Sequence, residues 1–128
     1  MTMWIDDRGH QPPLLPYYKP YAVEATSLTM DAGDIFFCGN GPTGVVNVGI
    51  ERKKIADLAG SIRSDRLAGL QLDGLVEYDI PILLVEGLWR AGRMGELETW
   101  SGTSFQPYYA GKQPVLYREM TNFLFSLW

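Results

Sequence analysis

The N-terminal half of the chain alternates between strand-like runs and breaks rich in proline or glycine. Residues 3–6 predict a short first strand, and four prolines within residues 11–20 argue against a regular helix there. Residues 21–29, 34–38 and 45–53 are rich in strand-forming residues and alternate in part, so they predict three further strands. Together these three runs predict an antiparallel meander.

The periodicity changes after the last of these runs. Apolar residues recur at helical spacing over residues 55–62 and again over residues 67–75, which predicts two short helices. Residues 81–87 form a continuous apolar run closed by an acid and a glycine, which is typical of a strand covered on both faces. Residues 88–109 give no firm assignment. An apolar stripe over residues 116–128 predicts a closing helix.

This order of elements predicts an α/β domain. A chain of 128 residues is long enough to bury roughly two thirds of its unfolded surface, and we expect a single domain over residues 1–128. A hydrophobic content of 46% with 20% charged residues argues against a disordered, fibrous or membrane protein. Because the chain has neither a long apolar run nor a signal-peptide pattern, we expect no membrane association and a cytoplasmic location, or a nuclear one in a eukaryote.

The single cysteine, Cys38, excludes an internal disulfide and a cysteine-based zinc site. Its apolar neighbours, residues 35–37, predict a buried thiol. The tryptophans are open to two interpretations, since such side chains stack on bases in some proteins and fill cores or interfaces in others. They are Trp4, Trp89, Trp100 and Trp128.

The net charge of −4 argues against a general nucleic-acid binder, because lysine and arginine supply most of the affinity for phosphate. The distribution of charge matters more than the sum. Five basic residues crowd one segment: Arg52, Lys53, Lys54, Arg63 and Arg66. The sequence therefore allows a local basic surface on an acidic protein.

The turn at residues 41–44 sets the geometry of the candidate site. If these four residues close a hairpin, Asn40 lies opposite Val45 and the pairing continues outward in register. Asp34 then faces Glu51 across the hairpin. Cross-strand partners lie about 5 Å apart at Cβ, so we expect the two carboxylates to be close.

Lys53 follows Glu51 by two positions, so strand alternation directs both side chains to one face, whereas Arg52 points to the other. Two carboxylates and one amine then converge. This set suits phosphodiester hydrolysis, because hard oxygen ligands hold Mg²⁺ or Mn²⁺ while the lysine orients the nucleophile. Two carboxylates this close also repel each other in the absence of a cation.

These residues carry a resemblance to a known family. Gly33-Asp34, a variable hairpin, Glu51-Arg52-Lys53 and then Asp57 resemble the signature of the XPF-type nuclease domain, which has a restriction-endonuclease-like fold. Further segments resemble the family's opening strand, its helix and turn, and its following strand: residues 5–8, 61–62, 65–67 and 84–87.

The resemblance implies a central mixed sheet, with an antiparallel meander, flanked by helices. It implies that Asp34 and Glu51 bind Mg²⁺ or Mn²⁺, that Lys53 positions or activates water, and that Arg52 and Asp57 support the site. The implied function is a metal-dependent DNA endonuclease selective for flap, fork or junction DNA. The alternative is a catalytically silent module of the same fold that binds DNA or a partner.

The chain departs from the family in its opening motif, where Gly9 stands at the place of a customary acid. Asp7 or Glu24 is a candidate substitute. Arg8 and Arg66 come from the matching segments and are further candidates for support. Glu86 closes its strand, where it either reaches the site or is a surface acid.

The resemblance also bears on partners. The chain has no tandem helix-hairpin-helix module, so we expect a domain short of the family's final C-terminal element. We also expect the closing helix to pair two chains as a homodimer or heterodimer, because its apolar stripe runs to Trp128.

Overall fold

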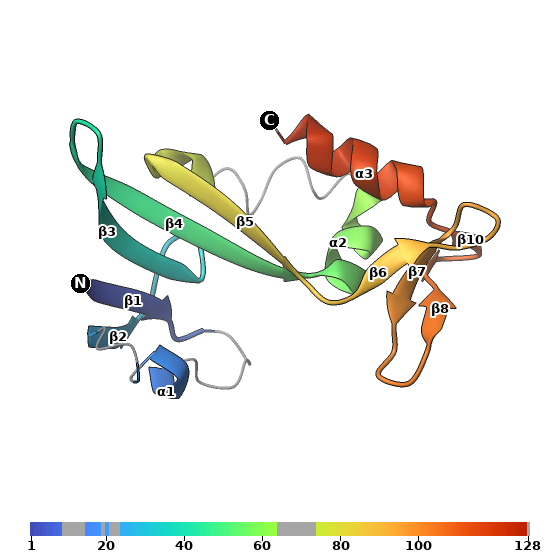
Figure 1. Ribbon diagram of the computed structural model, residues 1–128, viewed down its shortest axis with the longest axis horizontal. Helices are drawn as coiled ribbons and strands as arrows, with labels where there is room; N and C mark the ends of the chain where they lie inside the picture. Colours follow the sequence, from blue (N-terminus) through green and yellow to red (C-terminus); the bar gives the residue numbers. More distant parts are fainter. Residues whose placement is uncertain (9–14, 19, 21–23, 64–73, 128) are drawn as a thin grey trace. The chain divides into compact units, whose positions relative to one another are not determined.

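The computed structural model describes residues 1–8, 15–18, 20, 24–63 and 74–127 (Figure 1). Two compact units make up the chain. The first, here called the sheet unit, comprises Met1–Arg52 and Gly69–Leu84, and the second, the C-terminal unit, comprises Lys53–Ala68 and Val85–Trp128. The expectation of a single domain stays a prediction.

A five-stranded mixed sheet is the main feature of the first half of the chain, with the strand order β2-β1-β3-β4-β5. The strands are β1 (Thr2–Asp6), β2 (Glu24–Leu28), β3 (Ile35–Gly41), β4 (Gly44–Lys54) and β5 (Ile80–Glu86). β1 runs antiparallel to β3, and β3 runs antiparallel to β4. The α/β class and the mixed sheet are confirmed.

The predicted meander is wrong in one strand. The strand described within this range, β2, lies at the sheet edge and pairs in parallel with β1, which separates it from β3. The reason lies in burial: Met3 and Ile5 of β1 are 8% and 6% exposed, whereas β2 is mostly exposed. The more apolar strand takes the inner place, and local strand propensity carries no information on this choice.

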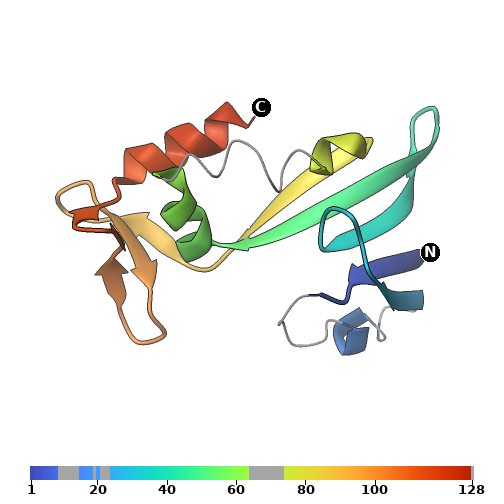
Figure 2. The same cartoon turned by 180° about the vertical axis from the view of Figure 1, so that it is seen from behind.

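The β3–β4 hairpin has the predicted register, with Asn40 opposite Val45 and Ile35 opposite Ile50. The loop itself is shorter than expected. Gly41 pairs with Gly44, so only residues 42 and 43 form the turn, and Gly44 adopts a φ of +136° that favours glycine. Figure 2 shows the hairpin from behind.

The core of the sheet unit lies on one face of the sheet. Met3, Ile5 and Ile35 are buried there, and Phe37 packs against them. The alternation that buries Ile35 and Phe37 turns Cys38 to the opposite side. Cys38 is accordingly exposed, with its Sγ 3.5 Å from an oxygen of Asn47, and the prediction of a buried thiol is wrong.

The prediction that β5 is covered on both faces is also wrong. Ile80, Ile82 and Leu84 are 43%, 38% and 46% exposed. β5 ends the strand order of the sheet, and an apolar run in the sequence does not distinguish an edge strand from a central one. Of the predicted helix over residues 67–75, only residues 74 and 75 are described, and the 3₁₀ turn η3 (Leu75–Glu77) begins at the second of them.

The C-terminal unit contains the two helices predicted at its ends, α2 (Ile55–Ile62) and α3 (Tyr117–Ser126), which pack together. Residues 88–109, which the sequence left unassigned, form most of its short strands. These are β6 (Trp89–Ala91), β7 (Leu97–Trp100), β8 (Phe105–Pro107), β9 (Tyr109–Ala110) and β10 (Gln113–Pro114). The largest fully buried side chains of the unit are Leu58, Leu97, Val115 and Met120.

The start of α3 is fixed by its own glutamate. The carboxylate of Glu119 accepts the N–H of Leu116 at 2.6 Å and the guanidinium of Arg63 at 2.9 Å. These two contacts hold the pKa of Glu119 below its ordinary value, against the opposing effect of partial burial. Since Arg63 directly follows α2, the same contacts tie the two helices together.

Two further predictions concern helices. The proline-rich segment contains one helical turn, α1 (Leu15–Tyr18), where we expected no regular helix. Among the residues that the structure describes, no helix is both long and apolar enough to cross a membrane.

Candidate metal centre

The candidate site lies on the sheet face opposite the core. Trp4 of β1 pairs with Phe36 of β3, which pairs with Gly49 of β4. The rings of Trp4 and Phe36 stack at 5.1 Å between centroids, and Tyr78 approaches Phe36 at 5.5 Å. Because side chains two apart on a strand share a face, Glu51 belongs to this aromatic face and not to the core.

Asp34 is fixed at the end of β3 by both its backbone and its side chain. Its N–H donates to the carbonyl of Ile50 at 2.7 Å, and its Oδ2 accepts the N–H of Arg52 at 2.6 Å. Gly33 makes this entry possible with a φ of +81°. The paired register ends at Ile35 and Ile50, one residue short of Asp34 and Glu51, so the facing of these two acids stays a prediction.

Glu51 is 7% exposed and is the one buried charged side chain among the residues described. A buried carboxylate is costly unless hydrogen bonds, an opposite charge or a metal ion compensate it. Such a group is therefore retained at a functional site more readily than on an ordinary strand.

Asp6 is joined to Asp34 through the backbone, although the sequence analysis selected only the neighbours of Asp6. The N–H of Asp6 donates to the carbonyl of Asp34 at 2.9 Å. Burial opposes ionisation of Asp6, but hydrogen bonds from the Met30 N–H and from Arg8 hold its pKa below the ordinary value. The sequence did carry a signal for Asp6, because the alternation of β1 places its side chain on the same face as that of Trp4.

Asp7 and Arg8 have structural contacts close to this site. The Asp7 carboxylate is exposed and accepts the Thr29 hydroxyl at 3.0 Å. Arg8 forms an ion pair with Asp6 at 3.1 Å and also donates to the carbonyl of Met30. Both residues thus attach the end of β1 to the segment that follows β2.

Several predicted residues belong to the C-terminal unit or lie outside the described residues. Lys53 is partly buried near the end of β4, and Asp57 is exposed in the first turn of α2, where an acid suits the helix dipole. Glu86 is partly buried at the end of β5. Gly9 and Arg66 lie outside the described residues.

The donor set at Asp34 and Glu51 fits a small hard cation. Among the described residues, no three His, Cys, Asp or Glu side chains gather into a group that could hold a metal ion. A Mg²⁺ ion, however, is commonly held by one or two carboxylates while it keeps several waters. Asp34 and Glu51 supply two carboxylates, the type of donor that such a site uses.

A mixed sheet with an aspartate at the end of one hairpin strand and a buried glutamate on the next defines the class: an XPF-type nuclease domain. The family model of the ERCC4 domain matches residues 5–101, and the chain belongs to this family. The resemblance noted in the sequence is thereby confirmed.

Solved structures agree with this fold. XPF from Aeropyrum pernix superimposes with a TM-score of 0.62 at 20% identity, covering 99% of this chain and 48% of that one. XPF from Aeropyrum pernix in complex with DNA gives a TM-score of 0.60 at 20% identity, covering 98% and 50% of the two chains. This chain thus spans about half the length of these structures. A search of curated proteins finds no match.

Proposed function

We propose that this chain is a divalent-metal-dependent DNA endonuclease that hydrolyses phosphodiester bonds in flap, fork or junction DNA. The observation that carries the proposal is the pair of carboxylates at the end of the β3–β4 hairpin. Asp34 accepts the N–H of Arg52 at 2.6 Å, and Glu51, the residue before Arg52, is buried; both acids stand at positions that resemble the family signature.

Asp34 and Glu51 would hold Mg²⁺ or Mn²⁺ at this point. When bound, a divalent ion polarises a phosphate oxygen and lowers the pKa of a coordinated water. Lys53 lies two residues after Glu51 in β4, so it shares the face of Glu51 and positions the attacking water.

The other candidates support these residues. Arg52 offers its backbone N–H to Asp34, and Asp57 adds negative charge at the first turn of α2. Asp6 and Arg8 fix the neighbouring end of β1, while Asp7 attaches it to Thr29. Arg66 and Glu86 complete the set of supporting residues.

DNA as the substrate is supported by family membership and by the similar XPF structure, which is in complex with DNA. A second candidate function is a catalytically silent DNA-binding or partner-binding module. One observation favours it: Asp34 already has a structural role as an acceptor for the N–H of Arg52, and this role needs no metal.

Pairing of two chains through α3 is the third part of the proposal. Most of the apolar stripe of α3 packs inside its own unit, with Met120 fully buried and Tyr117 and Phe123 against the same core. Phe125 remains 78% exposed and Leu127 39% exposed. Phe125, beside the predicted stripe, and Leu127, within it, are the exposed apolar residues available to a partner chain here, while Trp128 lies outside the described residues.

A cleavage assay with Glu51→Gln tests the proposal. The parent chain should cut flap, fork or four-way junction DNA only when Mg²⁺ or Mn²⁺ is present. Glu51→Gln should lower the rate by at least a hundredfold while DNA binding in EDTA is preserved, because the amide keeps the side-chain shape but loses a ligand charge. Glu77→Gln, at an exposed acid of η3, is the matched control and should cut like the parent.

The outcomes separate the two functions. Cleavage by Glu51→Gln at the parental rate would show that Glu51 is not a metal ligand. DNA binding by the parent without cleavage, in either metal and on every DNA form, would establish the silent module instead.

A further inference from the structure

The three-stranded sheet of the C-terminal unit has one face turned away from its core. β6, β7 and β8 are antiparallel, and Leu97 of β7 is fully buried toward the helices. Alternation along β7 directs Glu98 and Trp100 away from the face of Thr99. The register places Trp100 opposite Phe105 and Glu98 opposite Arg90, so these residues form one outer face.

Aromatic and apolar side chains occupy one end of this face. Trp100 is 43% exposed, and its ring meets that of Phe105 edge to face at 5.2 Å. The backbone N–H of Trp100 donates to the carbonyl of Leu88 at 2.9 Å. This bond places Leu88, which is 61% exposed, beside Trp100. A large aromatic ring exposed among other apolar side chains marks an interaction surface more often than an isolated apolar residue does.

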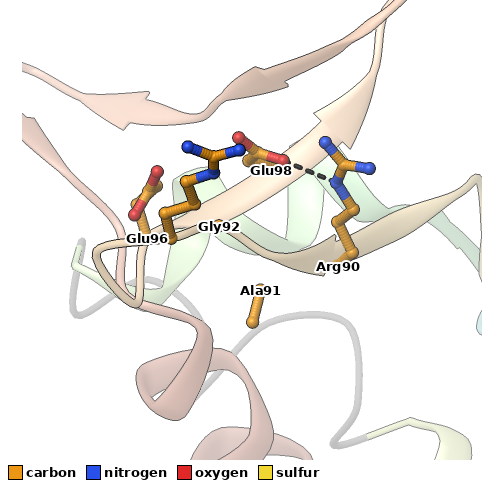
Figure 3. Close-up of a pocket in the computed structure, with 6 residues that line it drawn as sticks. Arg90, Ala91, Gly92, Glu96 and Glu98 are labelled. Carbon is orange, nitrogen blue, oxygen red and sulfur yellow. Dashed lines mark hydrogen bonds and ion pairs between the residues drawn. The ribbon is translucent and has the colours of Figure 1, made fainter.

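A fixed cation lies next to the aromatic pair. The guanidinium of Arg90 lies 4.2 Å from the centre of the Phe105 ring, and its Nε donates to Glu98 at 2.6 Å. Figure 3 shows Arg90 and Glu98 reaching toward each other across the two strands. Since the ion pair limits the positions of the Arg90 side chain, its remaining N–H groups are presented beside the aromatic rings.

An open pocket of about 480 Å³ borders this cation, lined by Arg90, Ala91, Gly92, Arg93, Glu96 and Glu98. Glu96 uses a carboxylate oxygen to accept the Met94 N–H at 2.8 Å, which shapes the turn between β6 and β7. The pocket therefore presents two arginines, and both of its acids have local hydrogen-bonding roles.

We propose that the outer face formed by Leu88, Arg90, Trp100 and Phe105 binds an unpaired DNA strand. A base stacks on the exposed ring of Trp100, which Phe105 supports edge to face, and the neighbouring phosphates contact Arg90 and the adjoining Arg93. An unpaired strand fits better than a duplex, because its bases offer free ring faces whereas those of a duplex are stacked on one another. The inference rests on the proposed function only in taking DNA as the ligand.

The local charge determines how much of the affinity for DNA comes from attraction to phosphate and how much from stacking. The two arginines of the pocket are matched by two glutamates, so the local net charge is zero, 2 minus 2. Stacking must therefore supply more of the affinity than phosphate attraction does. Because at most two phosphates are neutralised, the binding constant should fall with salt with a logarithmic slope no steeper than about −1.4 for single strands.

Fluorescence anisotropy in EDTA tests the inference, since cleavage is then absent. The probes are a labelled oligothymidylate strand and a labelled duplex of equal length. Trp100→Ala should weaken binding of the single strand about tenfold, a typical loss for one stacked base, and change duplex binding less than twofold. Trp100→Phe should recover most of the affinity, and Tyr109→Ala, at another exposed aromatic of this unit, should bind like the parent.

An unchanged single-strand affinity in Trp100→Ala would overturn the inference. An equal loss for duplex and single strand would also overturn it. So would a shift from dimer to monomer in sedimentation with unchanged DNA affinity, which would make the face a protein interface. If Trp100→Ala unfolds, Arg90→Gln replaces it, with an expected loss of about threefold. None of these results depends on Glu51, so the nuclease proposal is tested separately.

Discussion

At the scale of single residues, the site depends on how one carboxylate is held. Asp34 takes its position from Gly33, whose φ of +81° is open to glycine at little cost. Its Oδ2 then accepts the N–H of Arg52 at 2.6 Å. One oxygen of Asp34 is thus anchored to the backbone, which leaves its orientation fixed before any ligand arrives.

This arrangement predicts how the protein responds to metal. Mn²⁺ at about a hundredfold excess over its Kd should stabilise the parent by about 2.7 kcal/mol, because it binds only the folded state. Asp34→Asn should lose most of this gain, since it lacks a ligand charge. Without metal its stability should change little, because the amide oxygen still accepts the Arg52 N–H. Melting curves in EDTA and in Mn²⁺ measure both values.

Asp79→Asn is the matched control for this experiment. Asp79 likewise accepts a backbone N–H of β4, that of Asn47, at 2.8 Å, but at the other end of the strand from Glu51. The Asp79→Asn variant should keep the full stabilisation by Mn²⁺. Equal responses in the Asp34 and Asp79 variants would show that Asp34 is a structural acceptor and not a metal ligand.

At the scale of elements, the face of β4 that bears Glu51 also packs against a tyrosine at Gly49. A Cβ added at Gly49 would lie 2.0 Å from the ring of Tyr78. The Tyr78 hydroxyl donates to the carbonyl of Ala32 at 2.9 Å, and burial raises the pKa of this hydroxyl, as the charge of Asp31 also does. Tyr78 therefore packs on β4 and holds the segment that leads into Asp34.

Gly49→Ala should consequently destabilise the protein by about 1–3 kcal/mol, the usual range for overpacking. Gly39→Ala is the control in the neighbouring strand, where the nearest atom to an added Cβ is an ordinary 3.7 Å away. It should change the free energy of unfolding by less than about 1 kcal/mol. Urea unfolding of both variants decides the point, and equal losses would show that Tyr78 does not limit this position.

At the scale of the whole molecule, the feature of interest is the proposed pairing of two chains through α3. The chain spans about half the length of the similar XPF structures. The exposed end of α3 offers a surface for a second chain, with Phe125 78% exposed. Pairing would double the number of DNA contacts and raise the effective affinity.

Phe125→Ser should therefore shift the protein from dimer toward monomer in light scattering at a fixed concentration. Its melting temperature as a monomer should stay close to that of the parent, because the side chain lies outside the core of its own unit. Thr121→Ser, on a partly buried position of the same helix, is the control and should pair like the parent. A parent that is monomeric at high concentration would contradict the pairing.

Much of the fold and the site follows from the sequence alone. The helical spacing of residues 55–62 and 116–128 predicted α2 and α3, and the turn glycines predicted the β3–β4 register. These signals are local, because a helix depends on residues three or four apart and a tight hairpin on the few residues of its turn. The facing of Asp34 and Glu51 across the hairpin extends this register by one residue and stays a prediction.

The tertiary structure decided the features that depend on distant partners. It set β2 in parallel at the edge, exposed Cys38 and β5, and brought the backbone of Asp6 to Asp34. It also assembled the outer face of β6, β7 and β8 from residues that gave no periodic signal. The alternation of apolar and polar residues along a strand shows that its two faces differ. Only packing against the rest of the chain determines which strand it pairs with and which of its faces is buried.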